Sequence, residues 1–250
     1  MNVGVYGLGR FGRFWASLLA KRHQVTVYNR SPGREVPPGV RQASLEELMA
    51  NNDTVFLCCA ISAMEPVLNE LCPLARPGQV IADTCSVKVV PARQMLSILP
   101  PEVSLLATHP MFGPDSARQG LNGLPLVLHN LRGAWESFSF WKRDFSEQGL
   151  SVIDMTPDEH DKAAAYTQGV THFIGRVLSD MHLTDHPIAT QGYKKLLDIV
   201  QQTCNDPFQL FLDLQTYNPY TSEMRDDLKR SLNRILDRLS GSLDSVSERR

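Results

Sequence analysis

The chain has 250 residues, of which 42% are hydrophobic and 21% are charged. This composition is typical of a globular protein and too apolar for intrinsic disorder. The formal net charge of -2 excludes the broad positive field that non-specific nucleic-acid binding requires. We therefore expect no nucleic-acid partner.

The cysteine pattern and the apolar runs indicate the compartment. No apolar run approaches the roughly 20 residues of a membrane-spanning helix, so we expect no membrane association. The first residues lack the pattern of a signal peptide. The five cysteines are odd in number and none has CxxC spacing. We therefore expect reduced thiols in a cytoplasmic protein.

Short apolar runs alternate with helical patterns through the first 150 residues. Helices are predicted at 11–20, 45–50 and 63–72. Strands are predicted at 2–6, 24–28, 54–59, 80–83, 105–107 and 124–128, with a last one at 151–154. This alternation predicts an α/β fold, a Rossmann-type doubly wound and mostly parallel sheet with helices on both faces.

The pattern changes near residue 150. Thr156-Pro157-Asp158-Glu159 combines a capping threonine, a proline in the first turn and a glutamate three residues after the threonine, which predicts a helix start. From there to Leu239 nearly every segment has a helical pattern. We predict a dinucleotide-binding domain over residues 1–152, a smaller all-α domain over 153–240 and a flexible tail over 241–250.

The first strand is followed by Gly7-Leu8-Gly9-Arg10-Phe11-Gly12, a G-x-G-x-x-G run that leads into a helix. In this context the glycines allow a tight turn, close approach of a pyrophosphate and close packing of the helix on the strand. The start of the helix offers unpaired N–H groups to the phosphates. The motif therefore predicts a dinucleotide site.

The end of the second strand indicates which dinucleotide is bound. NAD-preferring sites carry a carboxylate there, whereas this chain has Asn29-Arg30-Ser31. An arginine pairs well with a 2′-phosphate, so we favour NADP, with NAD as the alternative if Arg30 only stacks on the adenine. The residues expected to hold the cofactor are Gly7, Gly9, Arg10, Phe11, Gly12, Asn29, Arg30, Ser31 and Ala60.

Two polar loops follow later strands of the predicted sheet. One covers residues 83–88 and the other covers 108–115. Open α/β sheets bind ligands beyond the carboxyl ends of their strands. His109, at the start of a loop rich in proline and glycine, is therefore a candidate general base, because imidazole titrates near neutral pH.

Four motifs in this order resemble those of the prephenate/arogenate dehydrogenases of tyrosine biosynthesis. They are the glycine run, Ser86-Val87-Lys88, His109-Pro110-Met111-Phe112-Gly113-Pro114 and His160-Asp161 with His172, and the resemblance covers about residues 1–220. It implies an NADP(NAD)-dependent oxidoreductase that decarboxylates a cyclohexadienyl acid by hydride transfer to the nicotinamide. His109 would accept the substrate hydroxyl's hydrogen bond and act as base, and it would have to lie close to the nicotinamide.

The resemblance also implies roles for neighbouring residues. Ser86 would orient His109 and contact substrate or nicotinamide. Asp115 would help gate the substrate pocket, although an aspartate there can also be a turn residue. Lys88 is expected to be structural or an electrostatic aid, with a solvated lysine as the alternative. His160 is expected to cap or pack at a helix start.

In the helical half, the resemblance implies that His172 borders the substrate, and Gln168, one turn before it, is expected near the same face. His172 follows Asp161 by three helical turns, so both are expected on one face. Lys194 keeps a basic substrate-binding position, but Asp198 stands where the family has an arginine for a substrate carboxylate. Either another cation binds that carboxylate (Lys194, Lys195 or Arg225 of the partner subunit), or the substrate carries an amine there, as arogenate does. A related cyclohexadienyl acid is a third alternative.

A homodimer through the helical domain is also implied. The last predicted helix has one apolar stripe suited to that contact, formed by Leu228, Leu232, Ile235, Leu236 and Leu239.

Two alternatives stay open. A β-hydroxyacid dehydrogenase or imine reductase would use Lys194 or Lys162 as proton donor and would not need the His109 loop. A non-catalytic NADP-sensing protein would not need Ser86 and His109 together. No metal is expected, because Pro187 places the His182/His186 pair in a connection between helices.

Overall fold

We describe the protein from a computed structural model, for residues 1–133 and 135–247, with side chains up to residue 240. The chain divides into two compact units, Met1–Asp161 and Lys162–Arg250. Each unit is described by itself.

The first unit is built on one eight-stranded sheet with the strand order β3-β2-β1-β4-β5-β6-β7-β8. Neighbouring strands are parallel except for the antiparallel pair β6 and β7. The doubly wound α/β fold is therefore confirmed. The strands are β1 (Asn2–Tyr6), β2 (Gln24–Tyr28), β3 (Val40–Gln42), β4 (Thr54–Leu57), β5 (Val80–Asp83), β6 (Ser104–Pro110), β7 (Pro125–Arg132) and β8 (Ser151–Ile153).

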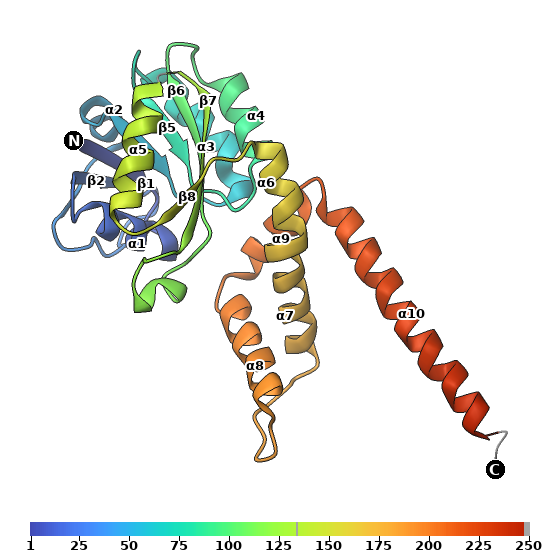
Figure 1. The fold of residues 1–250 in the computed structure, drawn as a ribbon. Coiled ribbons are helices and arrows are strands. Elements are labelled where there is room, and N and C mark those ends of the chain that lie inside the picture. Colours follow the sequence, from blue (N-terminus) through green and yellow to red (C-terminus); the bar gives the residue numbers. More distant parts are fainter. Residues whose placement is uncertain (134, 248–250) are drawn as a thin grey trace. The chain divides into compact units, whose positions relative to one another are not determined.

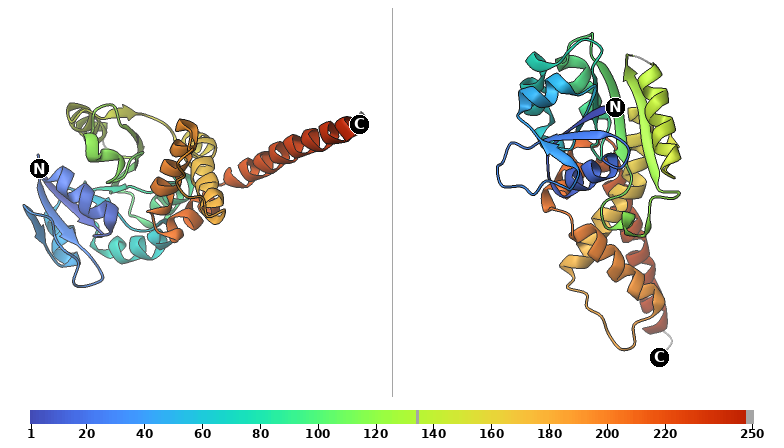
Figure 2. Two further views of the ribbon diagram at one scale, coloured as in Figure 1. Left: turned by 90° about the horizontal axis from the view of Figure 1, so that it is seen from below. Right: turned by 90° about the vertical axis from the view of Figure 1, so that its left-hand side faces the viewer.

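Helices cover both faces of this sheet (Figures 1 and 2). Helices α1 (Arg10–Leu19) and α5 (Trp135–Glu147) lie on one face, and α2 (Leu45–Asn51), α3 (Met64–Leu71) and α4 (Val89–Ile98) lie on the other. Single 3₁₀ turns, η1 (Ile61–Ala63), η2 (Cys72–Leu74) and η3 (Ser116–Gln119), complete the connections. The pattern analysis did not predict β3, α4 or α5.

An aromatic cluster joins α1 and α5 to the sheet. The Phe56 ring lies edge-on to both Trp15 and Trp141, with ring centroids 5.6 and 4.9 Å apart. Trp141 donates its indole N–H to the Thr54 hydroxyl at 3.3 Å. Large rings with a satisfied polar atom bury extensive apolar surface, so this cluster fixes the sheet that carries the site.

A continuous helical segment begins at the predicted capping motif. Helix α6 (Pro157–Ala164) has the Glu159 carboxylate accepting from the Thr156 N–H at 3.0 Å, and the Thr156 hydroxyl accepting from the Glu159 N–H at 3.4 Å. The predicted helix start is confirmed. A π-helical turn, η4 (Ala165–Gly169), then leads into α7 (Val170–Asp180). Such turns are rare and are frequently found at functional sites.

The second unit contains α7, α8 (Gln191–Cys204), α9 (Phe208–Tyr217) and α10 (Thr221–Ser247). Gly175 faces Thr203, and any Cβ at residue 175 would clash with the threonine hydroxyl, so the glycine permits the close packing of α7 on α8. The Arg176 guanidinium donates to the carbonyl oxygens of Thr203 and Asp206 and lies over the ring of Phe208. These contacts connect the end of α8 to the start of α9.

Helix α10 extends into the segment for which the sequence predicts a flexible tail, and residues 248–250 lie outside the described residues. In the described part of the chain, no helix has the length and apolarity needed to cross a bilayer. Residues 182–190 form the connection between α7 and α8, as expected. Among the described residues, no cluster of three or more His, Cys, Asp or Glu side chains is arranged for a metal ion.

Candidate active site

Four parallel neighbouring strands, β1, β4, β5 and β6, end at one edge of the sheet. The glycine run follows β1, Ala60 follows β4 and Ser86 follows β5, while His109 is the penultimate residue of β6. The topology therefore brings the predicted cofactor turn and the predicted base to the same edge, where open α/β sheets bind ligands.

The glycine turn has the geometry of a phosphate cradle. Gly7 has a φ of 102°, and a Cβ there would lie 2.6 Å from the Cys58 carbonyl oxygen. A Cβ on Gly12 would clash with the Gly7 carbonyl oxygen, whereas a Cβ on Gly9 would meet no protein atom within 4 Å. The fold thus requires the first and third glycines. The second leaves open space at the start of α1, where close approach of a pyrophosphate is expected.

Helix α1 begins without a capping side chain and without an acidic residue in its first turn. Its first N–H groups and its positive dipole end are therefore suited to an anionic group. The neighbouring side chains fit as well. The Asn29 side-chain oxygen accepts from the Leu8 N–H at 2.8 Å, and its amide donates to the Ser31 carbonyl at 2.6 Å. The Arg30 and Ser31 side chains are exposed.

The remaining predicted cofactor residues lie nearby. Phe11 is half-buried and stacks on Trp15 at 5.6 Å, so it supports the turn by packing. Arg10 forms an ion pair with Asp115, which also pairs with Arg118 at 2.8 Å. This ion pair links the glycine turn to the loop after His109. Both of its side chains are partly exposed, so the pair contributes little to stability.

His109 is buried, with 2% of its surface exposed. Its Nδ1 atom lies 2.8 Å from Nε2 of His160, and Nδ1 of His160 lies 2.8 Å from a carboxylate oxygen of Asp161. Ser86, by contrast, is half-buried. The expectation that Ser86 orients His109 stays a prediction, and the ring nitrogen that lies 2.8 Å from His109 belongs to His160.

A second set of buried charges lies beside His109. The Lys88 ammonium group forms an ion pair with Asp83 and donates to the Thr108 carbonyl at 2.6 Å. Lys88 is 1% exposed, so the solvated alternative for this lysine is wrong and it is a structural group. Burial raises the pKa of Asp83, and the charge of Lys88 partly offsets that effect.

Asp161 was not among the predicted site residues, and His160 was expected only to cap or pack. The Asp161 carboxylate accepts from the backbone N–H groups of Lys88 and Val89, at 2.7 and 2.9 Å, as well as from His160. In the sequence, His160 and Asp161 are recognisable only as two adjacent polar residues at the start of a helix. The sequence does not indicate that they contact His109 and Lys88, which lie 51 and 73 positions away.

In the second unit, Gln168 and His172 each have a buried polar atom without a partner, Oε1 and Nδ1 respectively. Burial lowers the pKa of His172 below its ordinary value, which favours a neutral ring. Lys194 and Asp198 are exposed on α8. The π-helical turn removes the basis for placing Asp161 and His172 on one face, because that argument assumed 3.6 residues per turn throughout.

The cysteines at the cofactor edge are not activated nucleophiles. Burial raises the pKa of the Cys58 and Cys59 thiols to about 12 and that of Cys85 well above its usual value. All five cysteines are free thiols. Since the thiolate is the nucleophilic form, covalent catalysis by these three residues is disfavoured.

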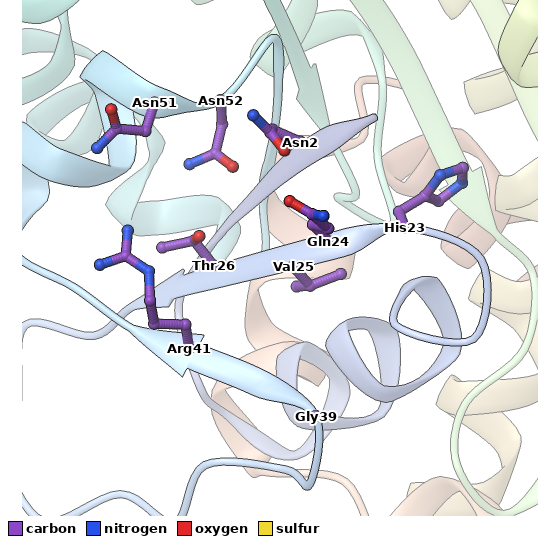
Figure 3. A pocket seen from close by; sticks show the side chains of 9 residues that line it. All are labelled: Asn2, His23, Gln24, Val25, Thr26, Gly39, Arg41, Asn51 and Asn52. Atoms are coloured by element: carbon purple, nitrogen blue, oxygen red, sulfur yellow. The ribbon is translucent and has the colours of Figure 1, made fainter.

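A polar hollow of about 350 Å³ lies near the amino ends of β1 and β2 (Figure 3). These ends are at the opposite edge of the sheet from the glycine turn, and none of the predicted site residues contributes to the hollow. It is lined by Asn2, His23, Gln24, Val25, Thr26, Gly39, Arg41, Asn51 and Asn52.

The sheet, the phosphate cradle and the buried histidine at the same edge define a Rossmann-type dehydrogenase that uses a nicotinamide dinucleotide. Residues 19–128 match the family described as prephenate dehydrogenase, nucleotide-binding domain, and residues 177–250 match the TYRAAT1-like C-terminal domain. The chain is 32% identical to arogenate dehydrogenase 2, chloroplastic, of Arabidopsis thaliana, over 97% of this chain and 71% of that protein. The chain belongs to the arogenate/prephenate dehydrogenase family.

Two further proteins show the same likeness. Arogenate dehydrogenase 1, chloroplastic, of Arabidopsis thaliana is 33% identical over 98% of this chain and 40% of its own length. The crystal structure of prephenate dehydrogenase from A. aeolicus, in complex with hydroxyphenyl propionate and NAD+, has the same fold. Its TM-score is 0.76 and its identity 18%, over 98% of this chain and 92% of that chain. The family assignment favours the predicted dehydrogenase over the alternatives left open by the sequence.

The space at Gly9 gives a test of the cradle. Gly9→Ala should raise the Kd for the dinucleotide about tenfold, or ~1.4 kcal/mol, because the added methyl group fills the space left for the pyrophosphate. The thermal unfolding midpoint should stay within about 2 °C of the wild type, because the methyl group meets no protein atom. Gly12→Ala is the control, and it should lower the unfolding midpoint. Unchanged binding by Gly9→Ala in a calorimetric titration would contradict this role.

Proposed function

We propose that the protein catalyses the oxidative decarboxylation of arogenate, with prephenate as a poorer substrate. The observation that carries this proposal is the buried His109 at the sheet edge that also holds the glycine turn. The bound nicotinamide supplies the hydride acceptor. His109 accepts the proton of the substrate's ring hydroxyl while the hydride leaves the carbon that bears this hydroxyl. Carbon dioxide then departs and the ring becomes aromatic.

The chain offers further groups to the substrate. Gln168 and His172 have buried polar atoms that lack partners, and a polar substrate would supply them. Lys194 is a cation for a carboxylate, Asp115 helps to gate the pocket, and Ser86 contacts the substrate. Asp198 replaces the arginine expected for the side-chain carboxylate, which favours a substrate carrying an amine. Both Arabidopsis relatives are named as arogenate dehydrogenases, which supports this choice.

Turnover can be followed by absorbance of the reduced nicotinamide, with arogenate and prephenate as substrates. We expect arogenate to have the higher kcat/KM. His109→Asn should lower kcat by about 10³-fold, the scale of a lost general base, with the dinucleotide Kd within about twofold of the wild type. His129→Asn, on the adjacent strand β7, is the matched control and should retain activity. Higher kcat/KM with prephenate, or full activity of His109→Asn, would contradict the proposal.

We further propose that NADP is preferred over NAD. The Asn29 side chain is engaged with the glycine turn, so no carboxylate stands where it would repel a 2′-phosphate. Exposed Arg30 and Ser31 follow directly and offer a charged donor and a hydroxyl.

Arg30→Ala should weaken NADP binding about tenfold, or ~1.4 kcal/mol, and leave NAD binding nearly unchanged, because only NADP carries the 2′-phosphate. The Kd values come from fluorescence titration of both cofactors. Arg34→Ala, an exposed arginine of the same loop, is the control and should have little effect. An equal loss for both cofactors would show that Arg30 stacks on the adenine instead.

We also propose a homodimer through α10. Four large apolar side chains of this helix are 51% to 58% exposed at spacings of three and four residues, Leu232, Ile235, Leu236 and Leu239. A second copy carries the same stripe, so a two-fold contact buries both.

Light scattering should give twice the chain mass of 28.0 kDa for the wild type. Ile235→Glu should shift the protein to the monomer, because it places two charges in the contact. Arg234→Glu, which changes the charge on the opposite side of the same helix, should remain dimeric. A monomeric wild type, or a dimer that tolerates Ile235→Glu, would refute this interface.

A further inference from the structure

Three buried side chains of the first unit form a continuous chain of hydrogen bonds. His109 Nδ1 lies 2.8 Å from His160 Nε2, and His160 Nδ1 lies 2.8 Å from Asp161 Oδ1. The exposed fractions are 2% for each histidine and 0% for the aspartate. The two rings meet edge-on, with centroids 5.0 Å apart. The three side chains are withdrawn from water. The protonation of their own nitrogen and oxygen atoms therefore determines which atom donates and which accepts in each of the two hydrogen bonds.

The carboxylate determines that order. Asp161 accepts from the backbone N–H groups of Lys88 and Val89, one on each of its two oxygens, so both oxygens act as acceptors. It therefore accepts from His160, whose proton must be on Nδ1. A neutral imidazole has one donor and one acceptor, so Nε2 of His160 accepts from Nδ1 of His109. His109 is then left with its lone pair on Nε2.

We propose that His160 and Asp161 are positioning residues that hold His109 in the tautomer with Nε2 as the proton acceptor. The inference rests on the proposed role of His109 and assigns the two groups that make that role possible. A base oriented by a second hydrogen-bonded group is a recurrent arrangement in enzymes.

The proton balance follows from this order. The ring-hydroxyl proton of the substrate moves to Nε2 of His109. The hydride leaves the carbon that bears this hydroxyl, and the bound nicotinamide is its acceptor. His109 becomes an imidazolium that still donates its Nδ1 proton to His160. The ionised Asp161 stabilises this positive charge through His160 and does not itself accept the proton. When carbon dioxide leaves, its bonding electrons make the ring aromatic and the ring oxygen a phenolate, and the imidazolium returns the Nε2 proton to this oxygen, so the reaction releases no net proton.

The backbone around His109 is fixed separately from its ring. The Lys88 ammonium group donates to the carbonyl of Thr108, the residue directly before His109, and pairs with Asp83. The loss of His160 would therefore leave the strand in place and remove the constraint on the ring alone. This separation makes a positioning role distinguishable from a structural one.

The primary test is the kinetics of two variants at position 160. His160→Leu removes the acceptor for His109 Nδ1, and we expect kcat to fall about 100-fold while substrate KM and dinucleotide Kd stay within about threefold. His160→Gln keeps a carbonyl oxygen as acceptor and should recover kcat to within about tenfold of the wild type. Thermal unfolding of both variants monitors the fold. The relay is overturned if His160→Leu keeps wild-type kcat while His109→Asn abolishes turnover.

A spectroscopic test is independent of turnover. Long-range ¹H–¹⁵N spectra of the histidine-labelled full chain report which ring nitrogen carries the proton. We expect His109 to carry it on Nδ1 in the wild type and to lose that preference in His160→Leu. A wild-type His109 protonated on Nε2 would overturn the relay whatever the kinetics show. Failure of the proposed function would instead appear as an active His109→Asn variant, so the two failures are distinguishable.

Discussion

The carboxylate of Asp161 has no solvent exposure, and its charge determines the arrangement of the site. Withdrawing an ionised carboxylate from water costs several kcal/mol unless hydrogen-bond donors replace the water. The donors to Asp161 include the N–H groups of Lys88 and Val89 and the ring of His160. Two of them belong to the start of α4, so the group that orders the histidine rings also fixes where that helix begins.

The buried Lys88–Asp83 pair stabilises a different part of the same edge. Breaking such a pair leaves an uncompensated charge in the interior, which is strongly destabilising. Here the lysine also donates to the Thr108 carbonyl, so the pair fastens the end of β5 to β6 just before His109. The ring and the backbone of one histidine are therefore held by two separate sets of charges.

The sequence predicted the groups that lie at strand ends, because parallel strands bring their carboxyl ends to one edge. The glycine turn and the position of His109 follow from that rule. The sequence did not predict which residues hold the ring and the backbone of His109. Lysine is rarely buried unless it is paired with an opposite charge, and the sequence did not indicate that Lys88 folds back onto Asp83. His160 reaches His109 across 51 residues, and local patterns carry no information on such a contact.

The helical unit shows a different limit of pattern reasoning. The resemblance nominated His172, and Gln168 was added because it precedes His172 by about one helical turn. Helical periodicity could not foresee the π-helical turn that contains Gln168 and directly precedes α7. Both side chains keep a buried polar atom without a partner, at a cost of about 1–3 kcal/mol for each such group. A polar ligand that supplies the two partners removes this cost, so the unpartnered atoms favour binding of such a ligand.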